Sequence, residues 1–259
     1  MSENDYKGII LAGGSGTRLY PVTKVVSKQL LPIYNKPMIY YPLSTLINSG
    51  VKEIMIITTP QDSPLFKRLL GDGGQWGVSF KFAIQEKPEG IAQSLVIADE
   101  WLKGSSPILI LGDNLFFGPN FSSIVKQSIK NNNGATLFAY KVKDPERFGV
   151  VDFDKNNNVL SIEEKPKEPK SSWAVTGLYI YNNQAVNYVK NLKKSNRGEY
   201  EITDLNRKYL EDGNLKTVLL NKDYSWLDTG THDSLLEASN FVQNSIIEFG
   251  RDLIDLDEL

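Results

Sequence analysis

The sequence predicts an α/β fold with a Rossmann-like, mixed and mostly parallel sheet flanked by helices, and a second, smaller β-rich lobe. Short apolar segments alternate with longer amphipathic segments up to about residue 142, a pattern typical of buried parallel strands joined by crossover helices. A glycine-rich loop follows the first of these segments, and in such sheets this loop commonly binds phosphate. Beyond about residue 142 the pattern changes to a β-hairpin, a further strand and then helices.

Five strands are predicted in the first part of the chain. Each is a short run rich in aliphatic and aromatic residues, the types favoured in strands. Because most of these runs are apolar at consecutive positions, we expect helices on both faces of the sheet. The strands are residues 7–12 (KGIILA), 53–58 (EIMIIT), 79–84 (SFKFAI), 107–111 (PILIL) and 135–142 (ATLFAYKV).

Amphipathic segments between these strands predict helices at residues 39–49, 91–102 and 121–131. Gly50 follows the first of them, and a glycine just past the end of a helix is a common C-cap. These helices supply the crossover connections that a parallel sheet requires.

The second part of the chain begins with a predicted hairpin, because FGVVDFD (148–154) and VLSIEEKP (159–166) flank the turn-forming stretch KNNN. Residues 174–181 (AVTGLYIY) predict another strand, and residues 183–191 and 201–211 predict helices. A final helix is expected because one helical face collects apolar side chains, namely Leu235, Ala238, Phe241, Val242, Ile246 and Phe249.

No internal repeat, low-complexity tract or long linker interrupts the chain. We therefore expect a single domain, residues 1–259, in one compact unit. Within it, residues 1–142 form one lobe, residues 143–230 form the second lobe, and residues 231–259 form a C-terminal helix and tail.

The composition excludes several classes of function. The chain has 259 residues, a net charge of −2, one histidine and no cysteine, so disulfides, thiolate metal sites and multi-histidine metal sites are impossible. There is no basic excess to bind nucleic acid. No apolar run approaches the ~20 residues that span a membrane, and MSENDYKG lacks the apolar region of a signal peptide. We expect a soluble, cytoplasmic protein.

The loop LAGGSGTRL (11–19) raises the question of its ligand. It is not a dinucleotide fingerprint, because Leu19 stands where G-x-G-x-x-G needs its third glycine, and no G-K-[ST] follows to make a Walker A loop. Successive N–H groups can form an anion-binding nest, and Arg18 and Lys28 add two charges that suit a triphosphate. A structural turn with two surface cations is the alternative. The predicted phosphate-binding residues are Leu11, Gly13, Gly14, Ser15, Gly16, Thr17 and Arg18.

Asp113 closes the strand PILILGD, and the carboxyl ends of parallel strands are where such sheets bind ligands. Mg²⁺ takes few protein carboxylates and completes its shell with phosphate oxygens and water. Without further context, an aspartate in G-D-N is a turn former, and Asp228 in WLDTG caps the next helix.

Longer blocks of sequence carry a resemblance to sugar-1-phosphate nucleotidyltransferases, and among them to the thymidylyltransferases that use glucose 1-phosphate. The related uridylyltransferases usually carry K-E-M-L-P where this chain has KQLLP. The blocks run in order over nearly the whole chain: LAGGSGTRLYPVTKVVSKQLLP (11–32), KPMIYYPLSTL (36–46), GDGGQWG (71–77), GDN (112–114), DPERFGVVDFD (144–154), EEKPKEPKS (163–171), AVTGLYIY (174–181), RGEYEITDLNR (197–207) and WLDTGTHDSLLEASNF (226–241).

The resemblance implies that dTTP and glucose 1-phosphate react to give dTDP-glucose and pyrophosphate, with Mg²⁺ required. It assigns Mg²⁺ to Asp113 and Asp228, and the triphosphate to Arg18 and Lys28. A phosphate oxygen of the sugar attacks the α-phosphorus, so the protein needs to position two anions and neutralise their charge. The implied catalytic residues are Arg18, Lys28, Asp113, Lys165 and Asp228.

The resemblance makes the second lobe the sugar-binding lobe. Lys165 would hold the sugar phosphate and Glu164 would accept a hexose hydroxyl. Neighbouring strand residues point to opposite faces, so the two can share a site only if the strand ends there, as Pro166 suggests. The implied sugar-phosphate contacts are Asn114, Gly149, Glu164, Lys165, Val175 and Trp226.

Gln85 and Gly90 match the base-binding segment of the resembling enzymes, which together with Asp113 completes the implied nucleotide site. A glutamine amide can pair with the thymine edge, but uracil shares that edge and lacks only a methyl group. A missing methyl discriminates by only ~1–3 kcal/mol, so we expect some use of UTP. We assign His232 to the first turn of the last helix and not to acid–base chemistry, because a phosphate monoester is already ionised near neutrality.

Two departures from the resembling enzymes concern regulation. The resembling enzymes usually extend about thirty residues further, so this chain resembles a short form. The G-H-D of those enzymes is replaced here by Gly118-Pro119-Asn120. Both changes predict weak or absent feedback inhibition by dTDP-rhamnose, the end product implied for this pathway of dTDP-deoxysugars. A homo-oligomer, dimer or tetramer, is expected from the same resemblance.

Three other functions remain open from the sequence. The first is a nucleotidyltransferase that uses another base or another hexose phosphate. The second is a silent nucleotide-sugar sensor, disfavoured because all five implied catalytic residues are present. The third is an NAD-dependent oxidoreductase, disfavoured by the missing third glycine.

Overall fold

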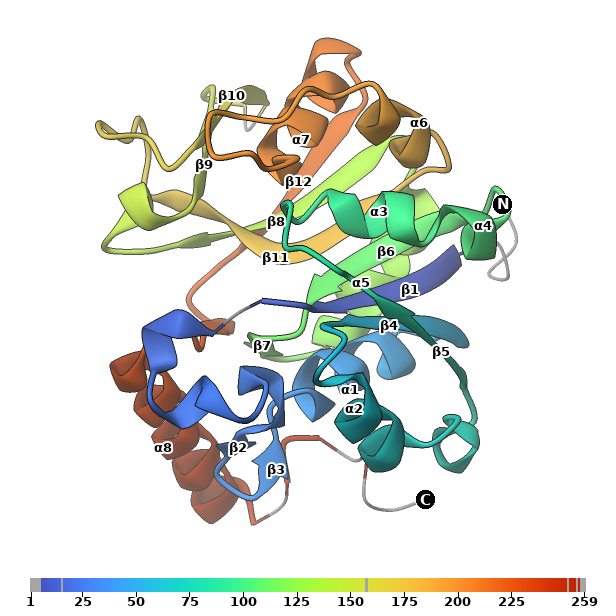
Figure 1. The fold of residues 1–259 in the computed structure, drawn as a ribbon. Helices are drawn as coiled ribbons and strands as arrows, with labels where there is room; N and C mark the ends of the chain where they lie inside the picture. Colours follow the sequence, from blue (N-terminus) through green and yellow to red (C-terminus); the bar gives the residue numbers. More distant parts are fainter. Residues whose placement is uncertain (1–5, 15, 157, 251, 255, 257–259) are drawn as a thin grey trace.

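A nine-stranded mixed sheet forms the centre of the computed structural model, which describes residues 6–14, 16–156, 158–250, 252–254 and 256. Seven strands follow the order β10-β9-β11-β6-β1-β4-β5, while β8 pairs with β11 and β12 pairs with β8 (Figure 1). The strands are β1 (Tyr6–Ala12), β4 (Glu53–Thr58), β5 (Ser79–Ile84), β6 (Ser106–Leu111), β8 (Ala135–Lys141), β9 (Gly149–Phe153), β10 (Val159–Glu164), β11 (Trp173–Tyr181) and β12 (Leu215–Leu220).

The strands of this sheet are parallel on one side of β6 and mostly antiparallel on the other. β1 is parallel to β4 and to β6, and β5 is parallel to β4. On the other side of β6, β11 runs antiparallel to β6, β8 and β9. The α/β fold predicted from the apolar runs is confirmed, and the change of direction falls beside the carboxyl end of β6.

Helices cover this sheet. In Figure 1, α6 and α7 lie beside β12 in the upper half, and α8 lies beside β2 (Pro32–Ile33) and β3 (Lys36–Pro37) in the lower half. The helices are α1 (Tyr40–Asn48), α2 (Ser63–Leu70), α3 (Gln93–Ile97), α4 (Asp99–Leu102), α5 (Phe121–Asn131), α6 (Ala185–Lys190), α7 (Ile202–Glu211) and α8 (His232–Phe249).

The helix predicted over residues 91–102 is wrong in its start and its continuity. The chain forms two shorter helices, α3 and α4, separated at Ala98. The start is delayed because the Ala92 N–H donates to the Tyr200 carbonyl, 3.2 Å away, which ties this residue to a distant segment. A tertiary contact therefore overrides the helical periodicity of the sequence.

Several short elements were not predicted from the periodicity of the sequence. They are α2, β12 and two small antiparallel sheets, of which one pairs β7 (Asn114–Phe117) with β13 (Ser225–Asp228) and the other pairs β2 (Pro32–Ile33) with β3 (Lys36–Pro37). Strands of two to four residues are too short to show a period.

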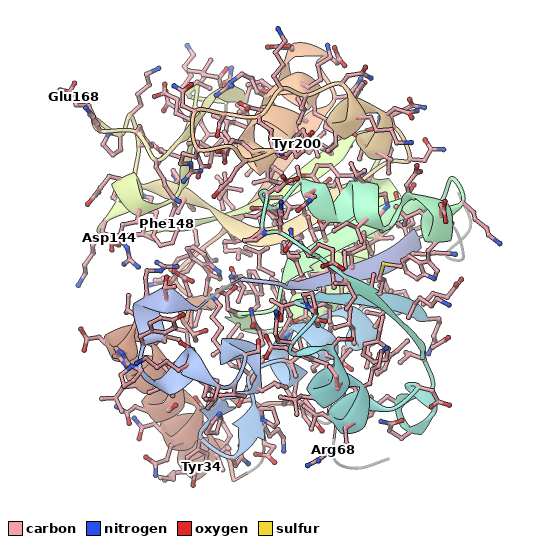
Figure 2. The ribbon with its side chains drawn as sticks, in the orientation of Figure 1. Tyr34, Arg68, Asp144, Phe148, Glu168 and Tyr200 are labelled. Atoms are coloured by element: carbon pink, nitrogen blue, oxygen red, sulfur yellow. The ribbon has the colours of Figure 1, made fainter. Side chains whose placement is uncertain are left out.

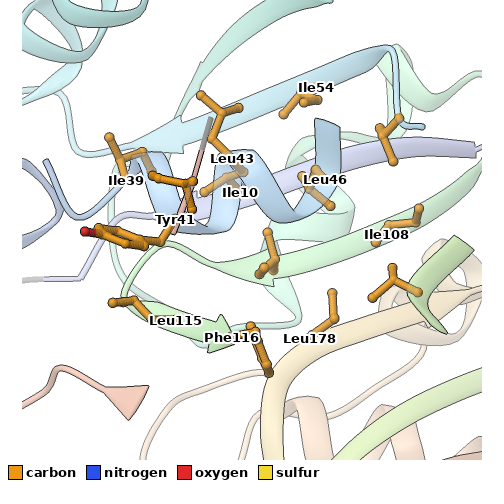
Figure 3. Packing of buried hydrophobic residues seen from close by; sticks show 14 of the residues in the cluster. Ile10, Ile39, Tyr41, Leu43, Leu46, Ile54, Ile108, Leu115, Phe116 and Leu178 are labelled. Atoms are coloured by element: carbon orange, nitrogen blue, oxygen red, sulfur yellow. The ribbon is translucent and has the colours of Figure 1, made fainter. Parts of the chain in front are cut away.

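Two hydrophobic clusters lie on opposite faces of the sheet. Ile9 belongs to one cluster and Ile10 to the other, and both are fully buried because successive strand residues point to opposite faces. Figure 3 shows the second cluster, in which Leu43 and Leu46 of α1 pack over Ile10. This two-sided burial confirms the expectation of helices on both faces.

The last helix, α8, begins with a capping box. The Thr231 side chain accepts from the Ser234 N–H, and the Ser234 side chain accepts from the Thr231 N–H. Ala238 and Val242 are buried as predicted, but Phe249 is 61% exposed, so the apolar face ends before that residue. Among the described residues, no helix is both long enough and apolar enough to cross a membrane.

Candidate active site

A cavity of about 450 Å³ opens at the carboxyl end of β6, where strand direction changes. Ligands bind at such switch points because strands diverge there and leave a crevice. The lining comes from both parts of the chain: Arg18, Ile91, Leu111, Asp113, Asn114, Arg147, Phe148, Gly149, Glu164, Lys165, Val175, Gly177, Tyr179, Ile202, Thr203, Asn206, Trp226 and Asp228.

Two carboxylates lie together in this cavity, of which Asp113 is buried and Asp228 is half-buried. β13 pairs with β7 so that Asp228 stands opposite Asn114, the residue after Asp113. Burial and the Asp113 charge raise the pKa of Asp228 from 3.8 to about 6. The alternative role of Asp228 as a helix cap is wrong, because Thr231 is the N-cap of α8.

Asp113 keeps its negative charge because a cation contacts it. Burial raises the pKa of the Asp113 carboxyl, but the Lys28 ammonium and a hydrogen bond from Asn114 outweigh burial and hold that pKa below its usual value. The Lys28 ammonium donates to Asp113 Oδ2, and both side chains are nearly buried. The short helix η4 (Lys28–Leu30) therefore places this lysine against Asp113 and not on the surface.

Two arginines face the same carboxylates. Arg18, in η2 (Thr17–Leu19), lines the cavity, and a Cβ on Gly230 would lie 2.9 Å from its Nη2. Arg147, in η6 (Pro145–Arg147), has Nη2 3.8 Å from Asp228 Oδ2. Figure 2 shows its neighbours Asp144 and Phe148 on one side of the molecule, at the edge of the upper lobe. The sequence analysis did not single out Arg147, although the block DPERFG contains it.

Among the described residues of the glycine-rich loop, Arg18 alone lines the cavity, so the loop lies beside it. A Cβ on Gly13 would lie 2.2 Å from Gln85 Oε1 and would displace this buried side chain, whereas Gly14 faces open space. Gly16 has a φ of 61° and precedes η2, and Thr17 begins η2. Leu11 accepts from the Gly112 N–H at 2.9 Å, and Ser15 lies outside the described residues.

Gln85 and Gly90 lie outside the cavity lining. Gln85 is 4% exposed, and its Nε2 donates to Gln93 Oε1 at 2.7 Å. Gly90 has a φ of 102°, and a Cβ there would lie 2.4 Å from the Tyr200 carbonyl oxygen. Gln85 therefore adjoins Gly13 of the glycine-rich loop.

On the opposite wall, Glu164 and Lys165 stand where β10 ends, as predicted. Lys165 has a φ of 43°, which turns the chain and brings both side chains to the cavity. Thr203 Oγ1 donates to Glu164 Oε2 at 2.6 Å, and Arg197 Nη2 donates to Glu164 Oε1 at 3.3 Å. Gly149 lies opposite Glu164 in the β9–β10 pairing. This wall combines a hydroxyl acceptor with two cations.

Asn114 and Trp226 line the cavity, but their polar groups bind each other. Asn114 Oδ1 accepts from Trp226 Nε1 at 2.6 Å and from the Gly177 N–H at 3.0 Å. Asn114 Nδ2 donates to Asp113 Oδ1 at 3.1 Å. The pair therefore orients Asp113. The predicted contact Val175 lies in β11 and lines the cavity.

His232 is the first residue of α8 and lies outside the cavity lining, as predicted. Its Nε2 is 3.1 Å from the Tyr20 carbonyl oxygen, and the side chain is exposed.

A second cavity, of about 680 Å³, lies between α1, α8 and the segment that follows β7. Gly118 and Pro119 line it, together with aromatic side chains. Three carboxylate residues also line it, and none of its described lining residues is basic: the acids are Asp223, Glu248 and Asp252.

The fold and the first cavity together define a class of protein: an α/β phosphate-binding protein with paired carboxylates and clustered cations at its switch point. Residues 7–245 match the nucleotidyl transferase family. A glucose-1-phosphate thymidylyltransferase of Neisseria meningitidis serogroup A is 59% identical over 237 residues, 92% of this chain and 82% of that protein. One of Xanthomonas campestris pv. campestris is 51% identical, over 98% of this chain and 90% of its own length.

A solved structure agrees with these relatives. A Bacillus anthracis protein described as a glucose-1-phosphate thymidylyltransferase, crystallised with sucrose, has a TM-score of 0.85 and 44% identity, covering 91% of this chain and 94% of its own. The chain therefore belongs to the nucleotidyl transferase family, within its glucose-1-phosphate thymidylyltransferase group.

Proposed function

We propose that this chain transfers a thymidylyl group from dTTP to glucose 1-phosphate, giving dTDP-glucose and pyrophosphate, the first step of dTDP-deoxysugar synthesis. The main supporting observation is that the Asp113–Asp228 pair and Arg18 line the same cavity as Glu164 and Lys165. One side suits a metal-bound triphosphate and the other suits a sugar phosphate. The relatives named above support this choice.

The reaction joins two anions in line. A phosphate oxygen of glucose 1-phosphate forms a bond to the α-phosphorus of dTTP, and the bond from that phosphorus to the oxygen bridging the β-phosphate breaks. Arg18 and Lys28 would hold the triphosphate and neutralise the charge that grows on pyrophosphate. Lys165 would hold the attacking phosphate, and Glu164 would accept a hydroxyl of the sugar.

We propose Mg²⁺ as the cofactor, held by Asp113 and Asp228. Their donor set fits this ion, because Mg²⁺ takes one or two carboxylates and fills its shell with phosphate oxygens and water. Among the described residues, no group of three or more histidine, aspartate or glutamate side chains is placed to hold a metal ion, so the proposed site depends on two carboxylates and on the substrate's phosphates. When bound, the ion would neutralise the triphosphate and polarise its α-phosphorus. Burial and then the Asp113 charge raise the pKa of Asp228 to about 6, so a bound cation would favour the ionised form of this carboxyl.

The base would lie near Gln85 and Gly90, beside the glycine loop that includes Gly13, Gly14, Ser15, Gly16 and Thr17. The Gln85 amide can pair with thymine or uracil, so we propose a preference for dTTP with measurable use of UTP. We also propose that residues 1–259 act as one domain in the cytoplasm, where nucleoside triphosphates and sugar phosphates are found.

The deciding experiment measures pyrophosphate release with Mg²⁺, glucose 1-phosphate and either dTTP or UTP. We expect faster release with dTTP, and loss of release in Asp113→Asn. Absence of release with both nucleotides from folded protein would contradict the proposal. Galactose 1-phosphate and mannose 1-phosphate, assayed in parallel, would then reveal another sugar, and binding of dTDP-glucose without turnover would indicate a sensor.

We propose that feedback inhibition by dTDP-sugars is weak. The second cavity has an acidic lining without a basic residue among its described members, and it contains the departing residues Gly118 and Pro119. A diphosphate is repelled by such a lining. Initial rates with 1–1,000 µM dTDP-rhamnose, as rough concentrations, test this, at saturating dTTP to suppress competition at the active site. Strong inhibition that dTTP does not relieve would contradict it.

We propose that the chain forms a homo-oligomer, dimer or tetramer. Leu236, Ile247 and Phe249 of α8 are 62%, 73% and 61% exposed, and exposed apolar groups of this size commonly mark an interface. Light scattering after size exclusion measures the mass directly. A mass of one chain at all concentrations tested would contradict the proposal.

A further inference from the structure

The segment that follows α8 holds the turn of the β2–β3 hairpin, through a contact that neither the motifs nor the proposed mechanism uses. Asp252 Oδ1 accepts from Asn35 Nδ2 at 3.0 Å, and Asp252 Oδ2 accepts from Lys36 Nζ at 2.9 Å. The Lys36 side chain is 4% exposed, and a charge so deeply buried depends on a carboxylate close to it. One carboxylate therefore binds two successive residues of the hairpin.

This C-terminal segment, of which residues 252–254 and 256 are described, is itself fixed to the core. Ile254 and Leu256 are buried in one of the two hydrophobic clusters. Trp76, in η5 (Gly74–Trp76), donates its Nε1–H to the Leu256 carbonyl at 2.6 Å. Asp252 therefore connects the turn of the hairpin to a segment that is packed in the core.

The hairpin needs such support. β2 and β3 have two residues each and form one short antiparallel pair, and an isolated two-stranded hairpin is at best marginally stable in water. The Tyr41 hydroxyl supports one strand by donating to the Ile33 carbonyl at 3.0 Å. Figure 2 shows Tyr34, in the turn of the hairpin, at the lower edge of the molecule. The hairpin therefore takes its position from its neighbours, and Asp252 holds its turn.

The base of the hairpin is bonded to the segment that contains Lys28. The Met38 N–H donates to the Leu31 carbonyl at 2.9 Å, and the Ile39 N–H donates to the Gln29 carbonyl at 2.9 Å. These bonds attach the hairpin to η4, a single turn of 3₁₀ helix, and such a turn has poor hydrogen-bond geometry of its own. Lys28 begins this turn, so the position of the lysine depends on the hairpin.

The hairpin also reaches the two proposed metal ligands. Thr229 Oγ1 lies 3.1 Å from Met38 Sδ and 2.9 Å from the Asp113 carbonyl oxygen. Thr229 directly follows Asp228 in the chain. A shift of the hairpin would therefore be felt on the triphosphate side of the cavity by Lys28 and by both carboxylates.

We propose that Asp252 is a positioning residue for the triphosphate side of the active site. By holding the hairpin at Asn35 and Lys36, it keeps Lys28 in the place where this lysine binds dTTP. This inference rests on the proposed function and deepens it, since it makes the C-terminal segment one of the determinants of nucleotide affinity.

The test compares Asp252→Asn with a matched control, Asp212→Asn. Asp212, at the C-cap of α7, also accepts from a lysine and from one further side chain, Lys208 at 2.8 Å and Tyr188 at 2.8 Å. The side chains of Asp252 and Asp212 are 35% and 29% exposed. Calorimetric titration with MgCl₂ present and without sugar phosphate measures the Kd for dTTP.

We expect Asp252→Asn to raise the Kd for dTTP about fivefold, because the loosened hairpin no longer fixes Lys28. Asp212→Asn should leave this Kd within about twofold, and Asp252→Glu should restore it because the charge is kept. The KM for glucose 1-phosphate should stay within about twofold in Asp252→Asn, because the groups proposed to hold the sugar lie on the opposite wall.

A double-mutant cycle with Lys28→Met tests the route of the effect. If Asp252 acts through Lys28, adding Asp252→Asn to Lys28→Met should change the Kd for dTTP by a factor of about one, against about five in the wild type. The far-ultraviolet circular dichroism of Asp252→Asn should match that of the wild type, because the side chain is partly exposed.

Two results would overturn the assignment. One is an equal Kd for dTTP in Asp252→Asn and in the wild type, and the other is an effect of Asp252→Asn that persists in full beside Lys28→Met. Failure of the proposed function is distinguishable, because then the wild type itself would release no pyrophosphate from dTTP and glucose 1-phosphate.

Discussion

The two walls of the cavity are charged in different ways. On the proposed metal side, the Lys28 and Asp113 side chains are 10% and 12% exposed and neutralise each other. On the proposed sugar side, the Lys165 and Arg197 side chains are 50% and 42% exposed, and both lie near Glu164. Each buried charge depends on the other, because neither has water as an alternative partner. Exposed charges keep water as a partner, so losing one is tolerated.

The largest effect is expected at the buried pair. Lys28→Met leaves Asp113 buried without its cation, which should lower the free energy of unfolding of the metal-free chain by about 3–5 kcal/mol. The same change removes charge neutralisation from the reaction, so kcat should fall by about two to three orders of magnitude. Urea unfolding in the presence of EDTA measures the change in the free energy of unfolding. The rate of pyrophosphate release measures the change in kcat.

Lys24→Met is the matched control, because Lys24 is exposed in the nearby segment η3 (Val22–Lys24). It should leave stability and rate close to the wild type. Equal losses in the two variants would mean that the burial of Lys28 is not what matters.

The second effect is a dependence of metal affinity on pH. Because the pKa of Asp228 is raised from 3.8 to about 6, the folded chain holds a proton there between pH 4 and 6 that the unfolded chain has released. This proton stabilises the metal-free fold at low pH, and the contribution is lost as pH rises through 6. A metal has to displace the proton, so the Kd for Mg²⁺ should rise about tenfold from pH 7.5 to pH 5.

Calorimetric titration with MgCl₂ measures this change. Asp228→Asn provides the control, because it removes the titrating group and should flatten the pH dependence while weakening binding at every pH. A Kd that is constant over this range in the wild type would show that Asp228 does not hold the ion.

The third effect belongs to the sugar side, where one contact is as buried as those of the metal side. Thr203 is 2% exposed and its hydroxyl orients Glu164. Thr203→Val keeps the shape and removes the donor, so the KM for glucose 1-phosphate should rise about five- to tenfold. Thr203→Ser should restore it. An equal rise of this KM in Thr203→Ser and in Thr203→Val would assign the effect to packing and not to the hydrogen bond.

The smallest effect is expected at the exposed edge of the sugar side. Glu199 lies 3.6 Å from Arg197, and the two side chains are 38% and 42% exposed. Glu199→Gln should change the free energy of unfolding by less than about 0.5 kcal/mol, because such pairs are screened by water and salt. A loss above about 1 kcal/mol in urea would show that the contrast between the two walls is weaker than their exposure indicates.

Much of the fold could be read from local patterns. The apolar runs that predict the parallel strands and the hairpin at 148–166 are where the sequence places them, because each pattern reports burial of the segment itself. The helix at 91–102 was predicted incorrectly at its start, since the Tyr200 carbonyl that holds Ala92 lies about a hundred residues away in sequence. Elements as short as β7 and β13 carry no period to read.

The candidate site likewise has parts that the sequence predicted and parts that it did not. The glycine-rich loop, the carboxylate at the end of β6 and the end of the strand at Glu164 could be predicted from the sequence, because glycine, aspartate and proline act locally. Three features became visible only in the folded chain: Asp228 lies near Asp113, Lys28 is buried against Asp113, and the cavity lining includes Arg147, Thr203 and Tyr179. These contacts join segments far apart in the chain, and their energies arise from burial and from charges that a sequence does not bring together until the sheet has formed.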